Sequence, residues 1–412
     1  MCASKRFPLI GISVGLIACQ AQADFFEESS LSLGLRNFYF DRDFKKSDAL
    51  KSRVGNWSQG FDLQFKSGYT SGPVQFAMET SSQFAYRLDG GGGRGPDSIV
   101  PYDRTRKEQV KEYGRSGAAI KLRTSKTEIR IGEHRPTLPV AYMDESRQLV
   151  TTYQGATVES KEWDALTLNA GRFWTFASRE SSNREKLYLL GTPDRGSDGL
   201  NFAGGTYTFI PSLSISYFYA QLEDIYDQNY LGLTYTADLG DGYSLKNDIR
   251  YYKNTGDGQQ LNGDYDNKSL GLMTSLRKGG HAFTVAYQEM DGSDPFPLLG
   301  YAPQLYLVNW STIAFYQAEE RSWQARYDYD FTSAGIPGLK FMTRYMKGTD
   351  IDRGEGMSHG LESERNFVVS YVMQQGALKG LGFEVRNIQI KSRYGSDFDE
   401  NRVATTYTWK FW

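Results

Sequence analysis

Cysteine is almost absent from the sequence. Only Cys2 and Cys19 occur among 412 residues, and both lie near the N-terminus. If the N-terminal segment is removed on export, the remaining chain has no thiol to form a disulfide, bind a metal or act as a nucleophile. The stability of such a large chain must then come from elsewhere, and a sheet that closes on itself by hydrogen bonding is a good candidate.

Histidine is scarce as well. His134, His281 and His359 are the three histidines, and their wide spacing matches neither a zinc site nor a serine–histidine pair. We therefore expect no catalytic residue, no metal and no cofactor. The net charge is −2, from 47 basic and 49 acidic residues. This balance gives no basic excess that would indicate a nucleic-acid partner.

No apolar run is long enough to cross a bilayer as a helix. Near the N-terminus, Lys5 and Arg6 precede a short apolar segment, and Ala21-Gln22-Ala23 follows as a cleavage signal. This order predicts a secretory signal peptide over residues 1–23, which is removed, and one exported domain over residues 24–412. An alternative remains open, because Leu16-Ile17-Ala18-Cys19 also looks like the acylation signal of a bacterial lipoprotein.

Aromatic residues and glycine are abundant, with 28 Tyr, 24 Phe and 43 Gly. This composition is typical of many half-buried strands joined by tight turns. An alternation of apolar and polar residues runs through the chain, and it predicts strands with one apolar face. It is clear in segments 61–66, 213–219, 231–235, 243–252, 323–331, 367–373 and 407–411. Alternation alone does not separate a soluble sandwich from a membrane barrel, in which the apolar face meets lipid.

Two features favour the membrane barrel. Aromatic residues cluster at the ends of the apolar stripes, where interfacial girdles need them, in segments 38–40, 217–219 and 407–412. The connections also alternate in length, as in an outer-membrane barrel with turns on one rim and loops on the other. The short connections lie at 70–73, 124–126, 160–162, 210–212, 240–242, 278–280, 332–337 and 375–380, and long ones include 87–114, 175–199, 254–267 and 348–363.

Eight short turns, with both termini on the turn side, imply nine hairpins and therefore 18 strands. We expect these strands to begin near residues 31, 60, 74, 117, 127, 153, 164, 200, 212, 228, 243, 268, 281, 321, 338, 364, 381 and 401. Segment 309–317 could be a nineteenth strand, but closure needs an even number, so we place it inside a long seventh loop. The predicted fold is all-β: a transmembrane antiparallel β-barrel with long extracellular loops and no plug domain.

Several motifs resemble one known family. The segment RYDYDFTSAGIPGLKFMTRY at 326–345 strongly resembles the OprD-type outer-membrane porins, the carboxylate-channel family of Gram-negative bacteria. Further matching segments are GEHRPTLPV at 132–140, DESRQL at 144–149, WDALTLNAGR at 163–172, SSNRE at 181–185 and QQGALKG at 374–380. The resemblance covers essentially the whole chain after residue 23. It implies an 18-stranded monomer in the outer membrane whose third and seventh loops fold inward, and it implies uptake of small carboxylates.

The charges of the strands can be assigned to the lumen by their phase relative to the apolar stripe. The basic set is Lys66, Lys121, Arg123, Arg130, Lys246, Arg250, Arg326, Lys340, Arg344, Arg386, Arg402 and Lys410, and the acidic set is Asp62, Glu79, Glu128, Asp238, Asp248, Asp328, Asp330 and Glu384. Twelve basic residues against eight acidic ones predict a modestly positive lumen. A row of arginines is a suitable path for an anion, because guanidinium binds carboxylate with two hydrogen bonds.

The resemblance also implies site residues. Members of the family carry a basic ladder on the final strands, matched by Arg386 and Arg402 with Arg344 and Lys340 as neighbours in phase; Glu384 and Ala404 depart from a fuller ladder. The residues expected at the constriction are Arg130, Arg135, Tyr142 and Arg147, with Ser293, Asp294 and Tyr301 from the seventh loop. Simpler interpretations stay open: a lattice of salt bridges for the strand arginines, a tether for Arg147, and turn chemistry for Asp294 beside Pro295.

We therefore expect a substrate-selective outer-membrane porin that passes small carboxylates by passive diffusion. Its expected partners are carboxylate solutes, outer-membrane lipid or lipopolysaccharide and the barrel-assembly machinery, with no nucleic acid. The alternatives are a barrel enzyme such as an outer-membrane lipase or protease, and a structural barrel that transports nothing. The sequence leaves open whether the solute is an aromatic acid, an aliphatic acid or a basic amino acid.

Overall fold

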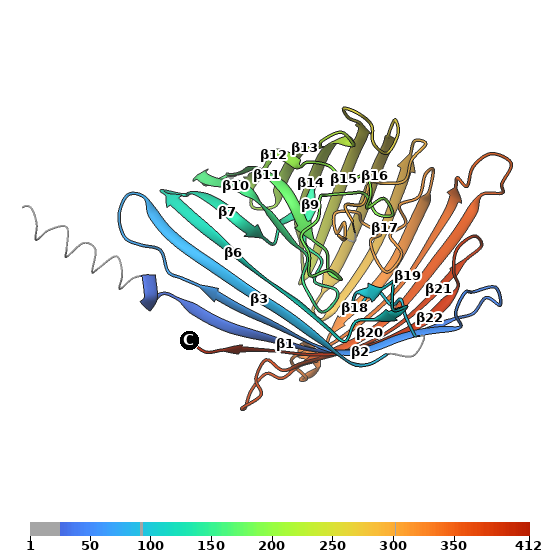
Figure 1. Ribbon diagram of the computed structural model, residues 1–412, viewed down its shortest axis with the longest axis horizontal. Coiled ribbons are helices and arrows are strands. Elements are labelled where there is room, and N and C mark those ends of the chain that lie inside the picture. The colour runs from blue at the N-terminus through green and yellow to red at the C-terminus, as the bar shows by residue number, and fades with distance from the viewer. Residues whose placement is uncertain (1–24, 91–93, 301) are drawn as a thin grey trace, which may run out of the picture.

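The chain forms a closed antiparallel β-barrel of 18 strands (Figure 1). The computed structural model describes residues 25–90, 94–300 and 302–412. Each barrel strand pairs with its neighbour along the chain, and β1 pairs with β22 over Ser32–Phe44 to close the sheet. The barrel strands are β1 (Ser30–Phe44), β2 (Arg53–Lys66), β3 (Gln75–Asp89), β6 (Glu112–Thr124), β7 (Thr127–His134), β10 (Thr152–Trp163), β11 (Leu166–Ala177), β12 (Leu200–Ile210), β13 (Leu213–Leu222), β14 (Tyr226–Gly240), β15 (Tyr243–Gly256), β16 (Asp266–Lys278), β17 (His281–Asp291), β18 (Arg321–Asp330), β19 (Leu339–Ile351), β20 (Gly360–Val372), β21 (Gly382–Ser392) and β22 (Phe398–Lys410).

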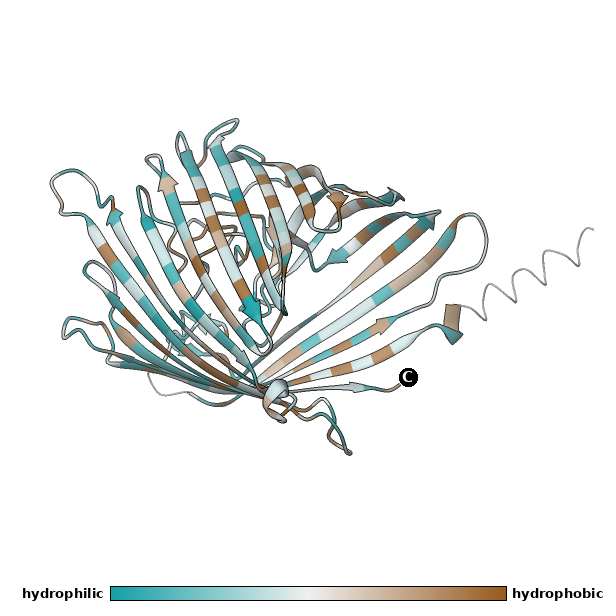
Figure 2. Cartoon of the chain, turned by 180° about the vertical axis from the view of Figure 1, so that it is seen from behind, coloured by the Kyte–Doolittle hydropathy of each residue, from teal (hydrophilic) through white to brown (hydrophobic). Residues whose placement is uncertain are grey.

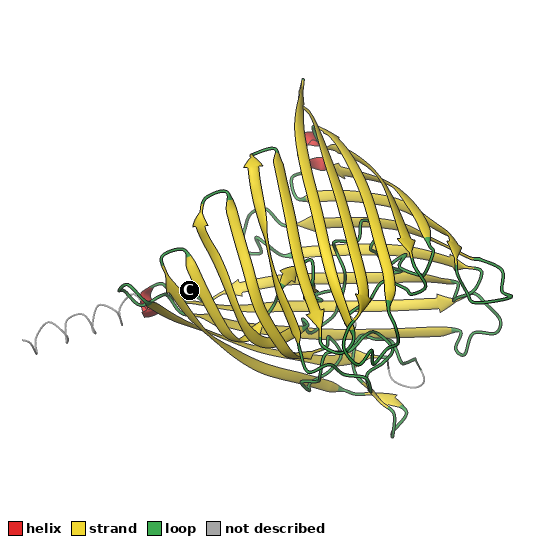
Figure 3. Cartoon of the chain, turned by 90° about the horizontal axis from the view of Figure 1, so that it is seen from above, coloured by secondary structure: helices red, strands yellow, loops and turns green. Residues whose placement is uncertain are grey.

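The predicted strand number and the alternation of short and long connections are confirmed (Figure 3). Segment 309–317 forms no strand and lies within the connection between β17 and β18, as expected. Some strands extend further toward the loops than the apolar pattern indicated, since β2 begins at Arg53 and β6 at Glu112. The structure adds elements that the sequence pattern did not predict: the hairpins β4 (Tyr102–Asp103)–β5 (Glu108–Gln109) and β8 (Thr137–Leu138)–β9 (Ala141–Tyr142), and the 3₁₀ helix η1 (Phe331–Ala334).

Apolar and polar residues alternate along the barrel strands, as the colour bands in Figure 2 show. The apolar ones are exposed on the outer face. Phe283 and Val285 on β17 and Val385 on β21 are each more than half exposed, as expected of side chains that meet lipid. In the described residues, no helix is both long and apolar enough to cross a membrane. The leader predicted over residues 1–23 lies outside the described residues.

Part of the inner face is apolar, which differs from the polar lumen that simple alternation predicts. Phe38 and Phe40 on β1 are 2% and 1% exposed, because they point inward beneath Ile99, Val100 and Leu149 of two long loops. The sequence pattern had placed both in an outer aromatic girdle, and that assignment is wrong; only Tyr39, between them, is exposed on the outside. Burial against the loops, rather than against lipid, explains these inward aromatic residues.

Four loops fill the lumen side of the barrel and are named here by their order. L2 spans residues 90–111, L3 spans 135–151, L4 spans 178–199 and L7 spans 292–320. Buried residues of L3, L4 and L7 form one apolar cluster with inward residues of β10 to β15. The inward folding of the third and seventh loops is therefore confirmed, and L2 and L4 take part as well.

Candidate functional site

L3 and L7 meet each other inside the barrel. The Tyr306 hydroxyl of L7 donates to the Thr137 carbonyl of L3 at 2.9 Å, and the Gln304 amide donates to the Pro139 carbonyl at 2.9 Å. The rings of Tyr142 in L3 and Tyr306 in L7 lie 6.3 Å apart, edge to face. Tyr142 therefore stands at the contact between the two loops. Tyr306 and Gln304 were not predicted, since nothing in their local sequence indicates a partner in L3.

Loop L7 is held on the barrel wall by a buried carboxylate on β20. Glu364 is fully buried and accepts from the Ser311 hydroxyl at 2.5 Å, from Thr312 N at 3.3 Å and from Ile313 N at 2.9 Å. Arg344 on β19 donates to the Trp310 carbonyl at 3.3 Å and to the Ser311 hydroxyl. A ladder position predicted from the sequence thus contacts L7 directly.

A second carboxyl group fixes the end of L7. Glu320 is fully buried, and its Oε2 accepts from Gln317 N at 3.1 Å. A Cβ on Gly348 of β19 would lie 1.9 Å from Glu320 Oε1, so only glycine leaves room for this carboxyl group against the wall. Burial, together with the nearby Glu362 carboxyl group, raises the pKa of Glu320 well above its ordinary value.

Loop L3 is held by β1 and β2, which follow β20 around the barrel after β21 and β22. Arg36 donates to the carbonyls of Glu145 at 2.5 Å and Arg147 at 2.9 Å, and Gln148 donates to the Ser58 hydroxyl at 2.8 Å. Gly60 makes this approach possible, because a Cβ there would lie 2.3 Å from Gln148 Oε1. Arg36 was missed in the charge assignment, although it is in phase with the inward residues of the first strand.

Asp144 and Arg147 of L3 are buried next to Arg179 of L4. Arg179 of L4 forms an ion pair with Asp144 at 2.7 Å, so L3 and L4 are joined. Burial alone would raise the pKa of Asp144, but Arg179 and a hydrogen bond from Ser146 hold it below its ordinary value. Burial, reinforced by repulsion from Arg179 and Arg402, lowers the pKa of Arg147 well below its usual range. Among the described residues, the Arg147 side chain donates only to Ser146 beside it, so the loop is tethered through the Arg147 carbonyl, not its guanidinium.

The predicted ladder residues all point inward, and most of them are paired with acids. Arg386 and Arg402 lie directly opposite each other on β21 and β22. Arg386 contacts Glu384 at 3.0 Å, and Lys340 contacts Asp330 at 3.3 Å. Arg402 pairs with the fully buried Glu400, and its own side chain is only 10% exposed, against 31% for Arg386. Arg386 is thus the more accessible of the two.

Three inward cations donate to uncharged acceptors instead. Arg36 and Arg344 donate to the loop atoms described above, and Arg115 on β6 donates to the carbonyls of Ser178 and Ser181 at 2.6 Å. Within the described residues, none of the three takes part in an ion pair. Each of the three thus lacks a direct ion pair while it holds L3, L4 or L7 in place. Carboxylates still lie near two of them: Glu145 and Glu384 near Arg36, and Glu364, which shares the Ser311 hydroxyl with Arg344.

Arg130 and Arg135 line a cavity of about 220 Å³ on the lumen side of β2, β3, β6 and β7. Arg130 contacts Glu79 at 2.9 Å, and Arg135 binds both oxygens of Asp62, at 2.7 and 2.9 Å. Lys66 lines the same cavity, and no described residue forms an ion pair with it. The cavity therefore brings two predicted site residues together with one ammonium group that forms no direct ion pair with a described residue.

The predicted L7 residues lie elsewhere. Ser293 donates to Asp294 at 2.9 Å, and Asp294 also accepts from Asp266 N at 3.1 Å, at the upper end of β16. These contacts are turn chemistry at the start of L7, which was the simpler interpretation of Asp294. Tyr301 lies outside the described residues. Among the residues that the structure describes, no three His, Cys, Asp or Glu side chains gather as metal ligands.

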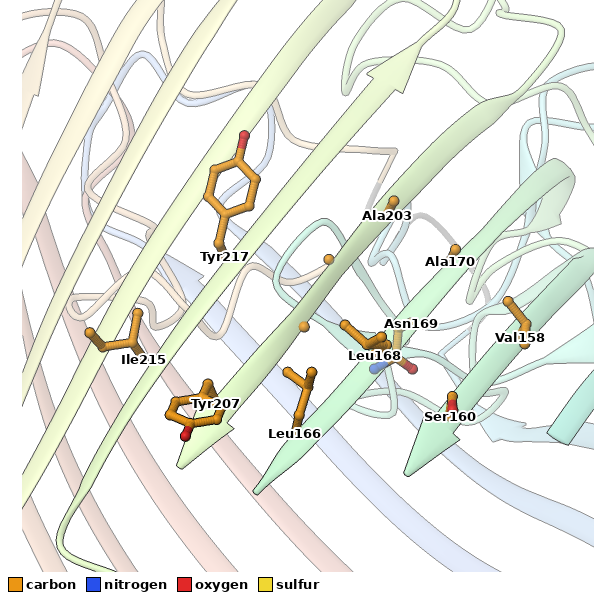
Figure 4. A pocket seen from close by; sticks show the side chains of 12 residues that line it. Val158, Ser160, Leu166, Leu168, Asn169, Ala170, Ala203, Tyr207, Ile215 and Tyr217 are labelled. Atoms are coloured by element: carbon orange, nitrogen blue, oxygen red, sulfur yellow. The ribbon is translucent and has the colours of Figure 1, made fainter. Parts of the chain in front are cut away.

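A larger hollow lies on the outside of the barrel. It has a volume of about 600 Å³ and is lined by β10 to β13 (Figure 4). Leu168, Tyr207 and Tyr217 border it and are 39% to 51% exposed on the outer wall. Small residues such as Ala170 and Ala203 make the hollow. Because its walls are apolar and face outward, it belongs to the lipid-facing surface rather than to the lumen.

Comparison with known proteins places this barrel in a family. The family model for "outer membrane porin, OprD family" matches residues 23–411. The porin-like protein GalP of Pseudomonas putida is 36% identical over 394 residues, which cover 94% of each chain. The crystal structure of Pseudomonas aeruginosa OccK9 (OpdG) superposes with a TM-score of 0.91 at 36% identity, covering 94% of this chain and 100% of that one.

A third similar protein was solved with a solute. The crystal structure of Pseudomonas aeruginosa OpdK with vanillate has a TM-score of 0.88 at 33% identity, covering 94% of this chain and 100% of that one. These relatives are porins and channels, not enzymes. A family match over nearly the whole chain and a closed 18-stranded barrel agree on one conclusion. This chain belongs to the OprD family of outer membrane porins.

Proposed function

We propose that this porin passes small carboxylate solutes selectively, by passive diffusion through a constriction whose cations attract them. The observation that carries the proposal is the set of inward cations that form no ion pair with any described residue: Arg36, Arg115 and Arg344 at the constriction, and Lys66 in the cavity beside it. A solute carboxylate is the natural partner for such groups.

Inward cations that already pair with acids can provide weak contacts for a passing carboxylate. Arg386 is partly exposed and already contacts Glu384, so a solute carboxylate would compete with that acid for the guanidinium. Such competition keeps each contact weak, and conduction needs weak successive sites rather than one tight site. The vanillate in OpdK is itself a carboxylate, which supports this class of solute for a chain of the same family.

Liposome swelling tests the proposal with matched solutes. Benzoate and benzyl alcohol are similar in size and differ in the carboxylate, so the proposed channel should admit benzoate faster. Planar-bilayer recording of the same protein should give discrete open-channel steps with anion preference. Equal rates for the two solutes, or cation preference, would contradict the proposed selectivity; hydrolysis without conductance would contradict a channel.

The ladder residues can be tested with a double variant. R386Q/R402Q should lower benzoate uptake and anion preference while the barrel still folds, because the change removes two inward charges and no loop anchor. The matched control R53Q/K268Q removes two cations on the outer face that are paired with Asp41 and Asp291. Equal uptake by the double variant and the control would show that the ladder assignment is wrong.

A further inference from the structure

The outer face of β19, β20 and β21 carries three cations close together. Lys347 and Lys391 lie opposite the same residue, Ser363, from the two flanking strands. Arg365 lies on the middle strand, opposite Tyr345 and Gln389. These positions share the outward phase of Tyr345 and Phe367, which are 41% and 40% exposed. Since neighbouring strands are about 4.8 Å apart, the Cα atoms of the two lysines are separated by roughly 10 Å.

No acid faces outward beside these cations. The outward positions of β20 and β21, and those of β19 up to Lys347, carry no aspartate or glutamate. The acids of these strands point inward: Glu362 and Glu364 are buried, and Glu384 contacts Arg386 in the lumen. Asp350, in the bulge above Lys347, accepts a hydrogen bond from Thr349 at 2.8 Å. The three outward charges are therefore uncompensated by their own strands.

The adjacent strand offers no free acid either. On β22 and in the loop before it, Asp399 pairs with Lys45 at 3.2 Å, and Asp397 pairs with Lys46 at 3.9 Å and accepts from Ser392 N at 2.6 Å. In the described part of the chain, no ion pair includes Lys347, Arg365 or Lys391. Arg365 donates to Asn387 at 3.1 Å and lies 4.9 Å from the Phe367 ring centroid, so its guanidinium is held in place.

Other outward cations near the loop rim are neutralised. Arg53 contacts Asp41 at 2.5 Å, Lys268 contacts Asp291 at 3.0 Å and Arg321 contacts Glu289 at 3.1 Å. Lys253 on β15 has no such pair, but it stands beside the paired Lys268 rather than in a cluster. The group on β19 to β21 thus differs from the rest of this rim in concentrating three unpaired charges.

The depth of the group in the membrane indicates its ligand. Tyr345 lies level with Arg365, and Phe367 and Val369 lie below it in the apolar band that meets lipid. The two lysines lie just beyond this band, where such side chains extend their charged ends into the headgroup layer. Arg365 keeps its guanidinium at the edge of the band, beside Asn387 and Phe367. The anion available in that layer is the phosphate of a lipid headgroup. The position of the three cations along the membrane normal, their charge and their spacing all favour a lipid headgroup phosphate as the partner.

We propose that Lys347, Arg365 and Lys391 form a binding site for the phosphate groups of an anionic lipid of the outer leaflet. The Arg365 guanidinium supplies the positioned donor, and the two lysines approach the same headgroup from either side. The site lies on the outer wall, separated from the lumen by the sheet, and is independent of the solute that the pore passes.

Native mass spectrometry of the purified full-length porin, with phosphorylated lipid A added in detergent, tests this proposal. The wild type should retain one lipid, and the variant K347Q/R365Q/K391Q should bind it about 100-fold more weakly, since each cation near a charged headgroup contributes roughly a factor of five. The matched control R53Q/K268Q/R321Q removes the same number of outward cations, all of which have acidic partners, and should retain lipid as the wild type does.

Three further outcomes would overturn the proposal. Equal retention by the triple variant and the control would show that the site does not bind lipid. Equal retention of lipid A and its dephosphorylated form would show that phosphate is not recognised. Displacement of the lipid by equimolar inorganic phosphate would show a site for a free anion. If the triple variant fails to insert, K347Q/K391Q against R53Q/K268Q, whose two cations have acidic partners, makes the same comparison with Arg365 left on Phe367.

Discussion

Replacing Glu364 with glutamine should release L7 from the barrel wall. The Glu364 carboxylate accepts three hydrogen bonds from the loop, from Ser311, Thr312 and Ile313, and a fourth from Asn366 at 2.7 Å on its own strand. Glutamine keeps the shape of the side chain. It replaces one acceptor oxygen with an NH₂ group, which then faces backbone or hydroxyl donors in a buried site.

The magnitude follows from these contacts. Hydrogen bonds to a buried charged group contribute about 1.5–3 kcal/mol each, and an unsatisfied buried donor costs about 1–3 kcal/mol. Because glutamine retains one acceptor, the net loss of docking free energy should be roughly 2–4 kcal/mol. That loss corresponds to an increase of about 30- to 1,000-fold in the population of undocked loop.

Amide hydrogen exchange measures the population of the undocked L7 loop directly. The amides of Thr312 and Ile313 should lose protection in Glu364→Gln by about the factor above, and single-channel conductance should rise because L7 narrows the lumen. The control is Glu128→Gln, which removes a lumen acid that pairs with Lys121 at 3.1 Å on the strands, away from L7. If both amides kept wild-type protection and conductance stayed unchanged, the assignment of Glu364 as the L7 anchor would be wrong.

Three further changes test other loop contacts. Burial and Glu362 raise the pKa of Glu320, so docking of the end of L7 is favoured while this carboxyl group is protonated and is lost as pH rises through the raised value. In the wild type, the amides of residues 317–320 should therefore be better protected from exchange at acid pH, whereas Glu320→Gln should show no such change. Equal pH dependence in both proteins would refute this. Arg36→Gln leaves two L3 carbonyls without their donor and removes an inward positive charge, so it should cost about 1–3 kcal/mol of L3 docking and reduce anion preference in planar bilayers. An unchanged reversal potential would contradict the second effect. Gly348→Ala would place a Cβ 1.9 Å from Glu320 Oε1. The variant should therefore have a lower midpoint of thermal unfolding, or faster amide exchange in L7 as Glu364→Gln does. A variant identical to the wild type in both measurements would show that the carboxyl group can move aside.

Alternation along the chain was sufficient to predict the barrel, because every strand must present apolar residues to lipid at every second position. Parity then excluded a strand at 309–317, and the structure places that segment in L7. Alternation failed where a side chain faces a loop instead of lipid or water. Phe38 and Phe40 look like girdle aromatics, yet they are buried by L2 and L3, whose position the local sequence does not encode.

The site was predictable as a set of inward charges but not as a set of contacts. Arg344, Arg386 and Arg402 were assigned to the lumen correctly from their phase, yet the phase does not distinguish the three. Arg402 is covered and paired with Glu400, whereas Arg344 holds L7 through uncharged atoms. Arg36 was accessible to the same phase argument, since it lies one residue after Leu35 on the outer stripe. Its partners in L3 are more than a hundred residues away, so only the fold reveals them.

The reversal potential in a gradient of sodium benzoate across a planar bilayer measures most directly whether this pore prefers organic anions. Arg36, Arg115 and Arg344 form no ion pair among the described residues, and they predict a potential of the sign set by benzoate. The potential should be smaller in the variant R36Q/R344Q and unchanged in the outer-face control R53Q/K268Q. A potential of the sign set by sodium, or one that is the same in all three proteins, would contradict a carboxylate-selective pore.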